Sequence, residues 1–340
     1  MSQIRAPYRM PLLVAVAMIT VWSILGVFDA RNVPSTGYQT DGSYTVISVD
    51  GGSPAETAGL RVEDRVVTVN GVAIENTREI LRQGRPAIGS SSVIEVERGG
   101  SLLTFDVVNG PPSTRTLLDS YLFVVIGLCF VFFGFSAYSK APARKTLLLA
   151  LAGGAIGVNF AGGPYIGSPA LSSVMAAIVV LLIYLGLAML YHFILSMPQP
   201  SAALERSGTL RLLYGPAVVA GVLLAVIIGS QMNATSGLNR MLQVAIGLVL
   251  AGYFLGSVVA VIVRYRSATD TERMANGLGL MLMGTIIGFA PLIVVIVSGI
   301  IAPRLVLPGS NYYILTFALI PITFSMAAVR SVRNGPTIEA

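Results

Sequence analysis

Long apolar runs dominate the pattern of hydrophobic and polar positions along this chain. Apolar runs of about 17 to 25 residues are typical of helices that cross a membrane, because the hydrocarbon core of a bilayer is about 30 Å thick. Eight runs of this kind predict eight transmembrane helices, over residues 11–28, 117–138, 147–163, 171–197, 212–230, 241–263, 275–301 and 312–329. The predicted fold class is therefore an α-helical polytopic membrane protein.

The first run follows Arg5 and Arg9, as the apolar core of a secretion signal follows its basic residues. The run is long for a signal, and Phe28-Asp29-Ala30 lacks the small-x-small pattern of a cleavage site. We interpret residues 1–29 as an N-terminal tail and a retained membrane helix.

A different pattern separates the first two runs. Residues 44–49 are mostly apolar and β-prone, and the turn-forming residues 50–54 end the predicted strand. Ser53 suits the N-cap of a helix, Pro54 suits its first turn, and Gly59 suits its end. A strand followed by a short helix is predicted here.

A second strand is predicted over residues 65–70, where alternation centres on Val67 and Val69. Asn70-Gly71 is a strong signal for a tight hairpin turn. This segment predicts a small α+β domain outside the membrane, which we bound at residues 30–112.

The core of this segment resembles a bacterial PDZ domain. The resemblance is carried by GSPAETAGL at residues 52–60, by Asp64, and by VVTVNG at residues 66–71, and it covers about residues 37–108. Glu63 departs from the pattern, because the family commonly has glycine before this aspartate. That departure leaves the form of the turn open.

The resemblance also implies the rest of the domain and its binding groove. A helix is implied over residues 76–83, and a hairpin over residues 92–98 and 102–108, closed at Gly99-Gly100. PDZ domains add an extended peptide to a sheet edge beside a helix, and backbone N–H groups hold its C-terminal carboxylate. The implied binding residues are Gly37, Tyr38 and Gln39 of the loop and edge at 36–40, and Thr77, Ile80 and Leu81 of the helix. A second interpretation stays open, in which Tyr38 covers the small core and Gly37 ends a linker.

Composition and charge support the membrane assignment and orient the chain. Hydrophobic residues make up 54% of the 340 residues and charged residues only 11%. Lys and Arg gather in alternate connections, as they do in cytoplasmic loops. This pattern places both termini in the cytoplasm and the PDZ domain outside, and the resemblance to bacterial PDZ domains implies a bacterial inner membrane. The net charge of +6 suits contact with anionic lipids, and no basic helix with interleaved aromatics predicts a nucleic acid partner.

Candidate catalytic chemistry is sparse. His192 is the only histidine, so the zinc site of an H-E-x-x-H intramembrane protease cannot form. Cys129 is the only cysteine, and we interpret it as a packing residue. We predict no enzyme activity, no metal and no cofactor.

Small residues predict close helix packing. They are Gly153, Gly154, Gly157, Gly162 and Gly163 in the third run, and Gly252 and Gly256 in the sixth. We favour internal packing for all of them, with a homodimer face as the alternative for the last pair.

A second resemblance concerns the membrane runs. The sequence YHFILSMP at residues 191–198 is similar to the His-Phe-x-Leu-x-x-Pro signature of multi-span sensor regions in ComP-like quorum-sensing histidine kinases. Met197 stands where an aromatic residue is common. The resemblance makes His192 and Pro198 candidate coupling residues, whereas the competing interpretation of His192 is an interfacial side chain. No kinase domain follows in residues 333–340, which we assign to a cytoplasmic tail.

Two functional hypotheses follow. In the first, the PDZ domain of a receptor binds a peptide or protein tail, and the helices of residues 113–332 pass the signal to a cytoplasmic kinase or regulator. In the second, the chain is a membrane-anchored PDZ scaffold for envelope proteins or a protease.

Overall fold

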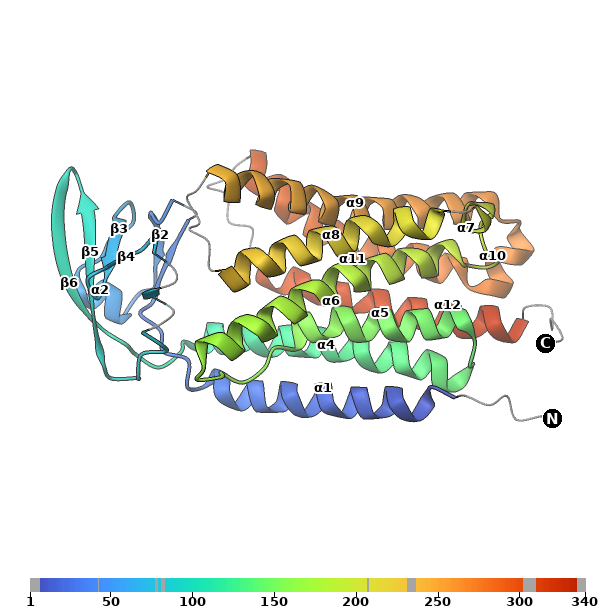
Figure 1. Cartoon of the computed structure of the whole chain (residues 1–340), viewed down its shortest axis with the longest axis horizontal. Coiled ribbons are helices and arrows are strands. Elements are labelled where there is room, and N and C mark those ends of the chain that lie inside the picture. The colour runs from blue at the N-terminus through green and yellow to red at the C-terminus, as the bar shows by residue number, and fades with distance from the viewer. Residues whose placement is uncertain are drawn as a thin grey trace.

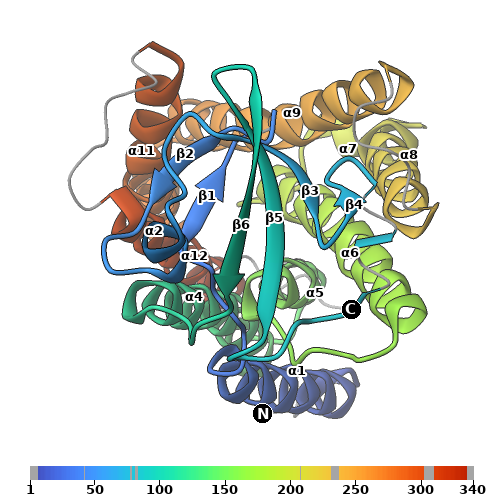
Figure 2. The same ribbon diagram turned by 90° about the vertical axis from the view of Figure 1, so that its left-hand side faces the viewer.

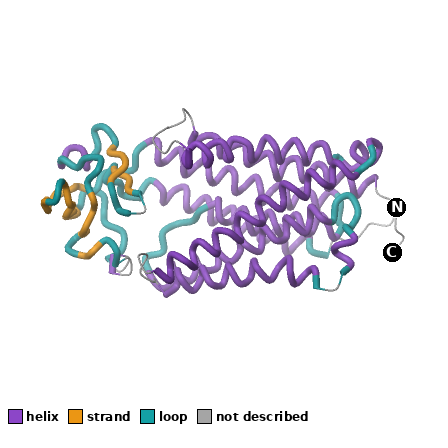
Figure 3. The backbone as a smooth tube through the Cα atoms, turned by 90° about the horizontal axis from the view of Figure 1, so that it is seen from above, coloured by secondary structure: helices purple, strands orange, loops and turns teal. Residues whose placement is uncertain are grey.

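A computed structural model describes residues 7–41, 43–76, 79–80, 83–206, 208–230, 237–301 and 310–334. It shows a bundle of long helices with a small β-rich domain at one end (Figure 1). The start of α1 (Arg9–Ala30) and the end of α12 (Leu319–Asn334) both lie at the opposite end of the bundle. The strands are confined to the domain end when the molecule is seen from above (Figure 3).

The bundle is made of helices that run along a common direction. After α1 these are α4 (Thr114–Lys140), α5 (Arg144–Ala161), α6 (Pro169–Leu195), α8 (Thr209–Ser230), α9 (Gly237–Ser267), α11 (Leu278–Ile301) and the 3₁₀ helix η1 (Ser310–Ala318), which continues into α12. The short helices α7 (Ala202–Glu205) and α10 (Asp270–Asn276) lie at the end away from the strands.

The number of candidate membrane spans is smaller than expected. Within the described residues, six helices are long and apolar enough to cross a membrane, and a seventh span arises if α10 and α11, bent by 74°, are taken as one. The multi-span fold is confirmed, but α5 is not among these candidates. Its first residues are Arg144 and Lys145, and it also contains Asn159, which lowers its apolar content.

Helix α5 nevertheless runs the length of the bundle. At its start, Lys145 Nζ lies 2.7 Å from Ser331 Oγ of α12, at the end away from the domain. Just beyond its end, the Tyr165 N–H donates to the Asp29 carboxylate of α1 at 2.8 Å, beside the domain. The expected third crossing is therefore present as a helix, and of its polar residues Lys145 bonds to α12 while the Asn159 amide bonds to the Ala155 carbonyl within α5.

Glycines explain how closely α4 and α5 pack. A Cβ atom placed on Gly127 of α4 would come within 2.6 Å of the Gly157 carbonyl oxygen, and one on Gly157 would come within 2.6 Å of the Gly127 carbonyl oxygen. Gly153 is equally enclosed, by the backbone of Phe130. The predicted packing role holds for Gly153, Gly157 and Gly163, the last of which lies against Trp22 of α1. It does not hold for Gly154, Gly162 and Gly252, where an added Cβ atom would meet nothing within 4 Å.

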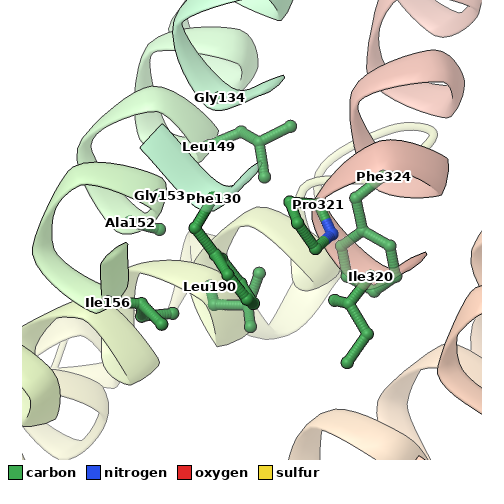
Figure 4. Close-up of a pocket in the computed structure, with 10 residues that line it drawn as sticks. All are labelled: Phe130, Gly134, Leu149, Ala152, Gly153, Ile156, Leu190, Ile320, Pro321 and Phe324. Carbon is green, nitrogen blue, oxygen red and sulfur yellow. The ribbon is translucent and has the colours of Figure 1, made fainter. Parts of the chain in front are cut away.

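The interior of the bundle is close-packed. An apolar cavity of about 10 Å³ lies between α4, α5, α6 and α12, with Phe130, Leu190 and Phe324 in its wall (Figure 4). A space of this size holds at most one water molecule. It is a packing gap and cannot hold a small-molecule ligand.

The β-rich domain consists of two antiparallel sheets and a short helix. Strands β1 (Tyr38–Thr40) and β2 (Val46–Val49) form a hairpin, and β4 (Val72–Ala73), β3 (Arg65–Val69), β5 (Ser91–Arg98) and β6 (Ser101–Val108) form a second sheet in that order. Figure 2 shows these strands lying across the ends of the helices. A core of its own holds them together, built from Val46, Ala55, Leu60, Val66, Ile94, Val96 and Val107.

The turns that local signals and the resemblance predicted for this domain are confirmed. The Ser53 hydroxyl accepts a hydrogen bond from the Glu56 N–H at 3.2 Å and caps α2 (Pro54–Ala58). Gly59 ends that helix in the left-handed region, with φ at 94°. The hairpin turns at Asn70-Gly71 and Gly99-Gly100 both have positive φ at each central residue, as two-residue hairpin turns of type I′ require.

Two details of the strands differ from expectation. The core side chains of β3 are Val66 and Val69, because a bulge between Val66 and Thr68 reverses the alternation that placed Val67 inside. Strand β2 begins at Val46 and not at Tyr44, because Tyr44 adopts a φ of 63° that no strand residue has. Both differences arise where the backbone departs from regular strand geometry, which cannot be inferred from the positions of apolar residues.

The turn at Glu63 keeps the conformation that glycine favours. Glu63 has a φ of 77°, which is uncommon for a residue with a side chain. Its backbone N–H donates to the Val46 carbonyl at 2.9 Å, which fixes the turn to β2. Glutamate at this position, where PDZ domains commonly have glycine, therefore keeps the turn and adds conformational strain.

Asp64, which follows, is buried and anchors the same turn. Its carboxylate accepts hydrogen bonds from Arg98 Nε at 2.6 Å, from Arg98 Nη2 at 2.7 Å and from the Arg61 N–H at 2.8 Å. Burial raises the pKa of the Asp64 carboxyl, but these hydrogen bonds and charges outweigh it and hold the pKa below its usual value. The pair joins the turn before β3 to the end of β5.

Replacing Glu63 by glycine should stabilise the domain. Removing a left-handed side chain gains about 1–2 kcal/mol, and the greater freedom of glycine in the unfolded chain returns about 0.4–1 kcal/mol. We expect a net gain of about 0.5–1 kcal/mol, measured as slower amide hydrogen exchange of β3 and β5 in the full-length protein. Glu63→Gln, which keeps the strain, should give no gain; an equal gain there would contradict this account.

Acid should weaken the domain through Asp64. The pKa of Asp64 in the folded protein lies below the unfolded value of about 3.9. Its contribution to the free energy of unfolding is therefore complete above that value and is lost as the pH falls through the folded pKa. Protection of the β3 and β5 amides, corrected for intrinsic exchange, should hold from pH 7 to about 5 and fall below about 4. Asp64→Asn should cost on the order of 3 kcal/mol at pH 7 and remove this part of the pH dependence.

Candidate peptide-binding site

Gly37 and its neighbours form a loop whose carbonyl groups are held by the protein. The Thr36 carbonyl accepts the Ala55 N–H at 2.9 Å, and the Gly37 carbonyl accepts the Asp50 N–H at 2.8 Å. Ser53 Oγ donates a longer bond of 3.4 Å to the Gly37 carbonyl. The start of α2 therefore draws both carbonyls inward.

Only glycine fits at position 37. Its φ of 81° lies in the left-handed region, and a Cβ atom there would clash with the side chain of Ser53. The sequence uses glycine at this point because the loop must both turn and lie against the start of α2.

The backbone N–H groups of this loop have no hydrogen-bond acceptor within the described part of the chain. With their carbonyls held inward, the backbone N–H groups of Thr36 and Gly37 make no hydrogen bond to any described residue. Adjacent free N–H groups at a turn form a concave site that attracts anions. A peptide carboxylate is such an anion.

The edge of β1 continues this site. Hydrogen-bonded and non-hydrogen-bonded pairs alternate in an antiparallel hairpin. Since Gly37 bonds to Asp50, the next bonded pair is Gln39 with Ser48, and the backbone groups of Tyr38 point to the other edge. Within the described residues, β1 pairs only with β2, so that edge can accept an extended peptide.

The side chains on β1 are divided between core and solvent. Tyr38 packs on the domain core, and burial raises the pKa of its phenol, so the ring stays neutral. Gln39 is exposed. Tyr38 thus covers the core, as the second interpretation expected, while its backbone is placed as the first requires.

A turn stabilised by Asp41 holds β1 against β2. Its carboxylate accepts the N–H groups of Ser43 at 2.8 Å and Thr45 at 3.0 Å. The Ser43 hydroxyl and these N–H groups hold the pKa of Asp41 below its usual value, so the turn keeps its charge at neutral pH.

The helix that the PDZ resemblance implies opposite β1 is described only in part. Ile80 is half-buried, and its N–H donates to the Asn76 carbonyl at 3.2 Å, which is a helical turn. Thr77 and Leu81 lie outside the described residues. Their assignment to the groove stays a prediction.

The candidate coupling residues lie at the other end of the bundle. His192 is buried between α6 and α8, with Nδ1 3.0 Å from the Tyr214 hydroxyl, and the Pro198 carbonyl accepts a hydrogen bond from Lys145 Nζ at 3.2 Å. The structure therefore does not bring them together with the groove, and any link between the two regions runs along the helices.

One cluster beside the groove was missed from the sequence. Asp29, Arg85 and Tyr165 meet between α1, the domain and the connection from α5 to α6. The only local signal was an acid in the last turn of an apolar helix, where the helix dipole disfavours negative charge. Its partners are 56 and 136 positions away.

The comparison with protein families agrees with this geometry. Residues 30–108 match the family model described as a PDZ domain. No curated protein matches the chain. The chain is a multi-span membrane protein that carries a PDZ domain after its first long helix, and this domain implies binding of a peptide or protein.

Proposed function

We propose that the chain is a bacterial inner-membrane receptor whose extracytoplasmic PDZ domain binds the C-terminus of a peptide or protein. The observation that carries this proposal is the pair of free N–H groups at Thr36 and Gly37, next to the open edge of β1. These N–H groups donate hydrogen bonds to the C-terminal carboxylate of the peptide. The backbone of Tyr38 pairs with the peptide residues that precede that carboxylate. Affinity comes from the main chain, and Ile80, Thr77 and Leu81 select the side chains.

The orientation rests on charge. Lys140 ends α4, and Arg144 and Lys145 begin α5, at the same end of the bundle as the basic residues in the last turns of α9 and α12. Cytoplasmic loops carry such an excess of Lys and Arg. This supports an extracytoplasmic domain and cytoplasmic termini in contact with anionic lipids.

Signalling requires that the ligand distinguish two states of the bundle. A ligand that binds both states equally shifts nothing. The similarity of residues 191–198 to ComP-like sensor regions supports a cytoplasmic kinase or regulator as the partner. The chain acts without catalysis or cofactor in this proposal, and His192 and Pro198 belong to its cytoplasmic half.

Binding to a free carboxylate is the first test. The full-length protein in lipid nanodiscs is titrated with heptapeptide pools, each fixed at the C-terminal residue and random elsewhere, in carboxylate and amidated forms. At least one carboxylate pool should bind, and its amidated form should bind 10-fold or more weakly, because the loop N–H groups lose a charged acceptor.

Gly37→Ala should abolish this binding. The added Cβ clashes with Ser53 and the left-handed φ is strained, so the loop N–H groups move. Gly51→Ala, at a turn glycine without positive φ where an added Cβ atom meets nothing within 4 Å, is the matched control and should bind the same pool within about threefold. Equal binding of amidated and free pools, or normal binding by Gly37→Ala, would refute the carboxylate site.

A further inference from the structure

The Asp29–Arg85–Tyr165 cluster joins three segments that are far apart in the sequence. Arg85 Nη1 lies 3.0 Å from Asp29 Oδ1, and Arg85 Nη2 lies 2.9 Å from Asp29 Oδ2. The Tyr165 N–H donates to Asp29 Oδ2 at 2.8 Å, and the Arg85 N–H donates to the Tyr165 hydroxyl at 3.2 Å. The Arg85 guanidinium also lies 4.2 Å from the centre of the Tyr165 ring. We call this cluster the joint.

The joint differs from an ordinary surface ion pair. The Arg85 and Asp29 side chains are only 22% and 23% exposed and pair through two parallel bonds. The pair between Arg65 and Glu97 has one contact of 3.4 Å, with side chains 54% and 45% exposed. Two-fold pairing fixes direction as well as distance, so the joint can transmit a rotation that the other pair cannot.

The position of Asp29 in α1 explains why it needs a cation. Asp29 lies in the last turn of the helix, where the helix dipole disfavours negative charge. Arg85 of the domain supplies the compensating positive charge, and the Tyr165 N–H adds a hydrogen bond from the bundle. Docking of the domain therefore offsets the unfavourable charge at the end of α1.

The groove leads directly into the joint. The turn that contains Ile80 ends where the Gln83 N–H donates to the Ile80 carbonyl at 3.2 Å. Gly84 follows with a φ of 74°, and Arg85 comes next. The Gln83 hydrogen bond and Gly84 thus link the turn of Ile80 to Arg85, so a shift of that turn is passed to the Arg85 backbone and its bond to Tyr165.

On the other side, the joint reaches two parts of the bundle. Asp29 belongs to α1, which packs against α4 and α5. Tyr165 lies in the connection between α5 and α6, next to Gly163, where any side chain would clash with Trp22 of α1. The close packing of α4 and α5 leaves little room for a displacement at this end to be absorbed locally.

We propose that the joint couples the peptide groove to the bundle, so that the helix facing β1, the end of α1 and the start of α6 change position together. This rests on the proposed function for the meaning of the groove, but the mechanical link is independent of any ligand. Coupling of this kind is reciprocal in free energy, since a ligand that favours one bundle state must bind more tightly to the groove by the same factor when that state is favoured by other means.

A double-mutant cycle without ligand tests the coupling. Ile80→Ala loosens the helix that faces β1 in the full-length protein in nanodiscs, and amide exchange is read in the last turn of α1 and the first turn of α6. With the joint intact, exchange there should accelerate about fivefold, at the lower end of usual coupling strengths. In the Arg85→Gln background, Ile80→Ala should change it by less than about twofold.

Controls separate coupling from unfolding. The Arg65→Gln background, which removes the exposed pair, should leave the transmitted effect intact, and the β5 amides should stay protected in every variant. Should Arg85→Gln disturb the domain, the conservative Tyr165→Phe and Asp29→Asn replace it in the cycle. Two results would overturn the proposal. In the first, Ile80→Ala does not accelerate exchange in α1 and α6 even with the joint intact. In the second, it accelerates exchange equally with the joint intact and in the Arg85→Gln background. Failure of every peptide pool to bind would instead count against the proposed function and leave this cycle decisive.

Discussion

The absence of water in the hydrocarbon core governs the architecture of this protein. Backbone N–H and C=O groups have no solvent partner there, so a spanning segment must satisfy them itself, and a helix does so completely. Every described residue with positive φ lies outside the long helices, in the domain or at a helix end. The irregular backbone that peptide recognition needs is therefore found only beyond the ends of the bundle.

This constraint divides the stabilising interactions into two kinds. Between α4 and α5, where burying apolar surface gains little over lipid contact, glycines bring the backbones together. In the domain, which lies outside the hydrocarbon core, a separate apolar core and the Asp64–Arg98 pair stabilise the fold. The joint lies at the boundary, and it is ionic because neither apolar packing nor backbone pairing is available between a helix end and a solvated turn.

Local signals made most of this predictable. The caps of α2 and the hairpin turn at residues 70–71 depend on a few adjacent residues, and the structure confirms them. The apolar runs predicted the multi-span fold, although only six or seven of the eight expected spans are candidates among the described residues. The bulge at Val67 was missed because alternation does not reveal an extra residue.

The site itself was predictable only in part. Gly37 was found because a resemblance located it, whereas its free N–H groups depend on Ala55 and Asp50 holding the carbonyls. The joint was beyond reach, since Asp29, Arg85 and Tyr165 are ordinary residues until the fold brings them together. Polar contacts between distant segments leave no periodic trace in a sequence.

The central claim is that a groove on one side of the membrane controls a partner on the other. Its most direct test is cross-linking capture from native membranes, with mass spectrometry comparing wild type with Gly37→Ala and the Gly51→Ala control. The account predicts a cytoplasmic kinase or regulator whose yield changes with Gly37→Ala and not with Gly51→Ala. Capture of envelope proteins or a protease alone, or of a cytoplasmic partner indifferent to Gly37, would contradict it and favour a membrane-anchored scaffold.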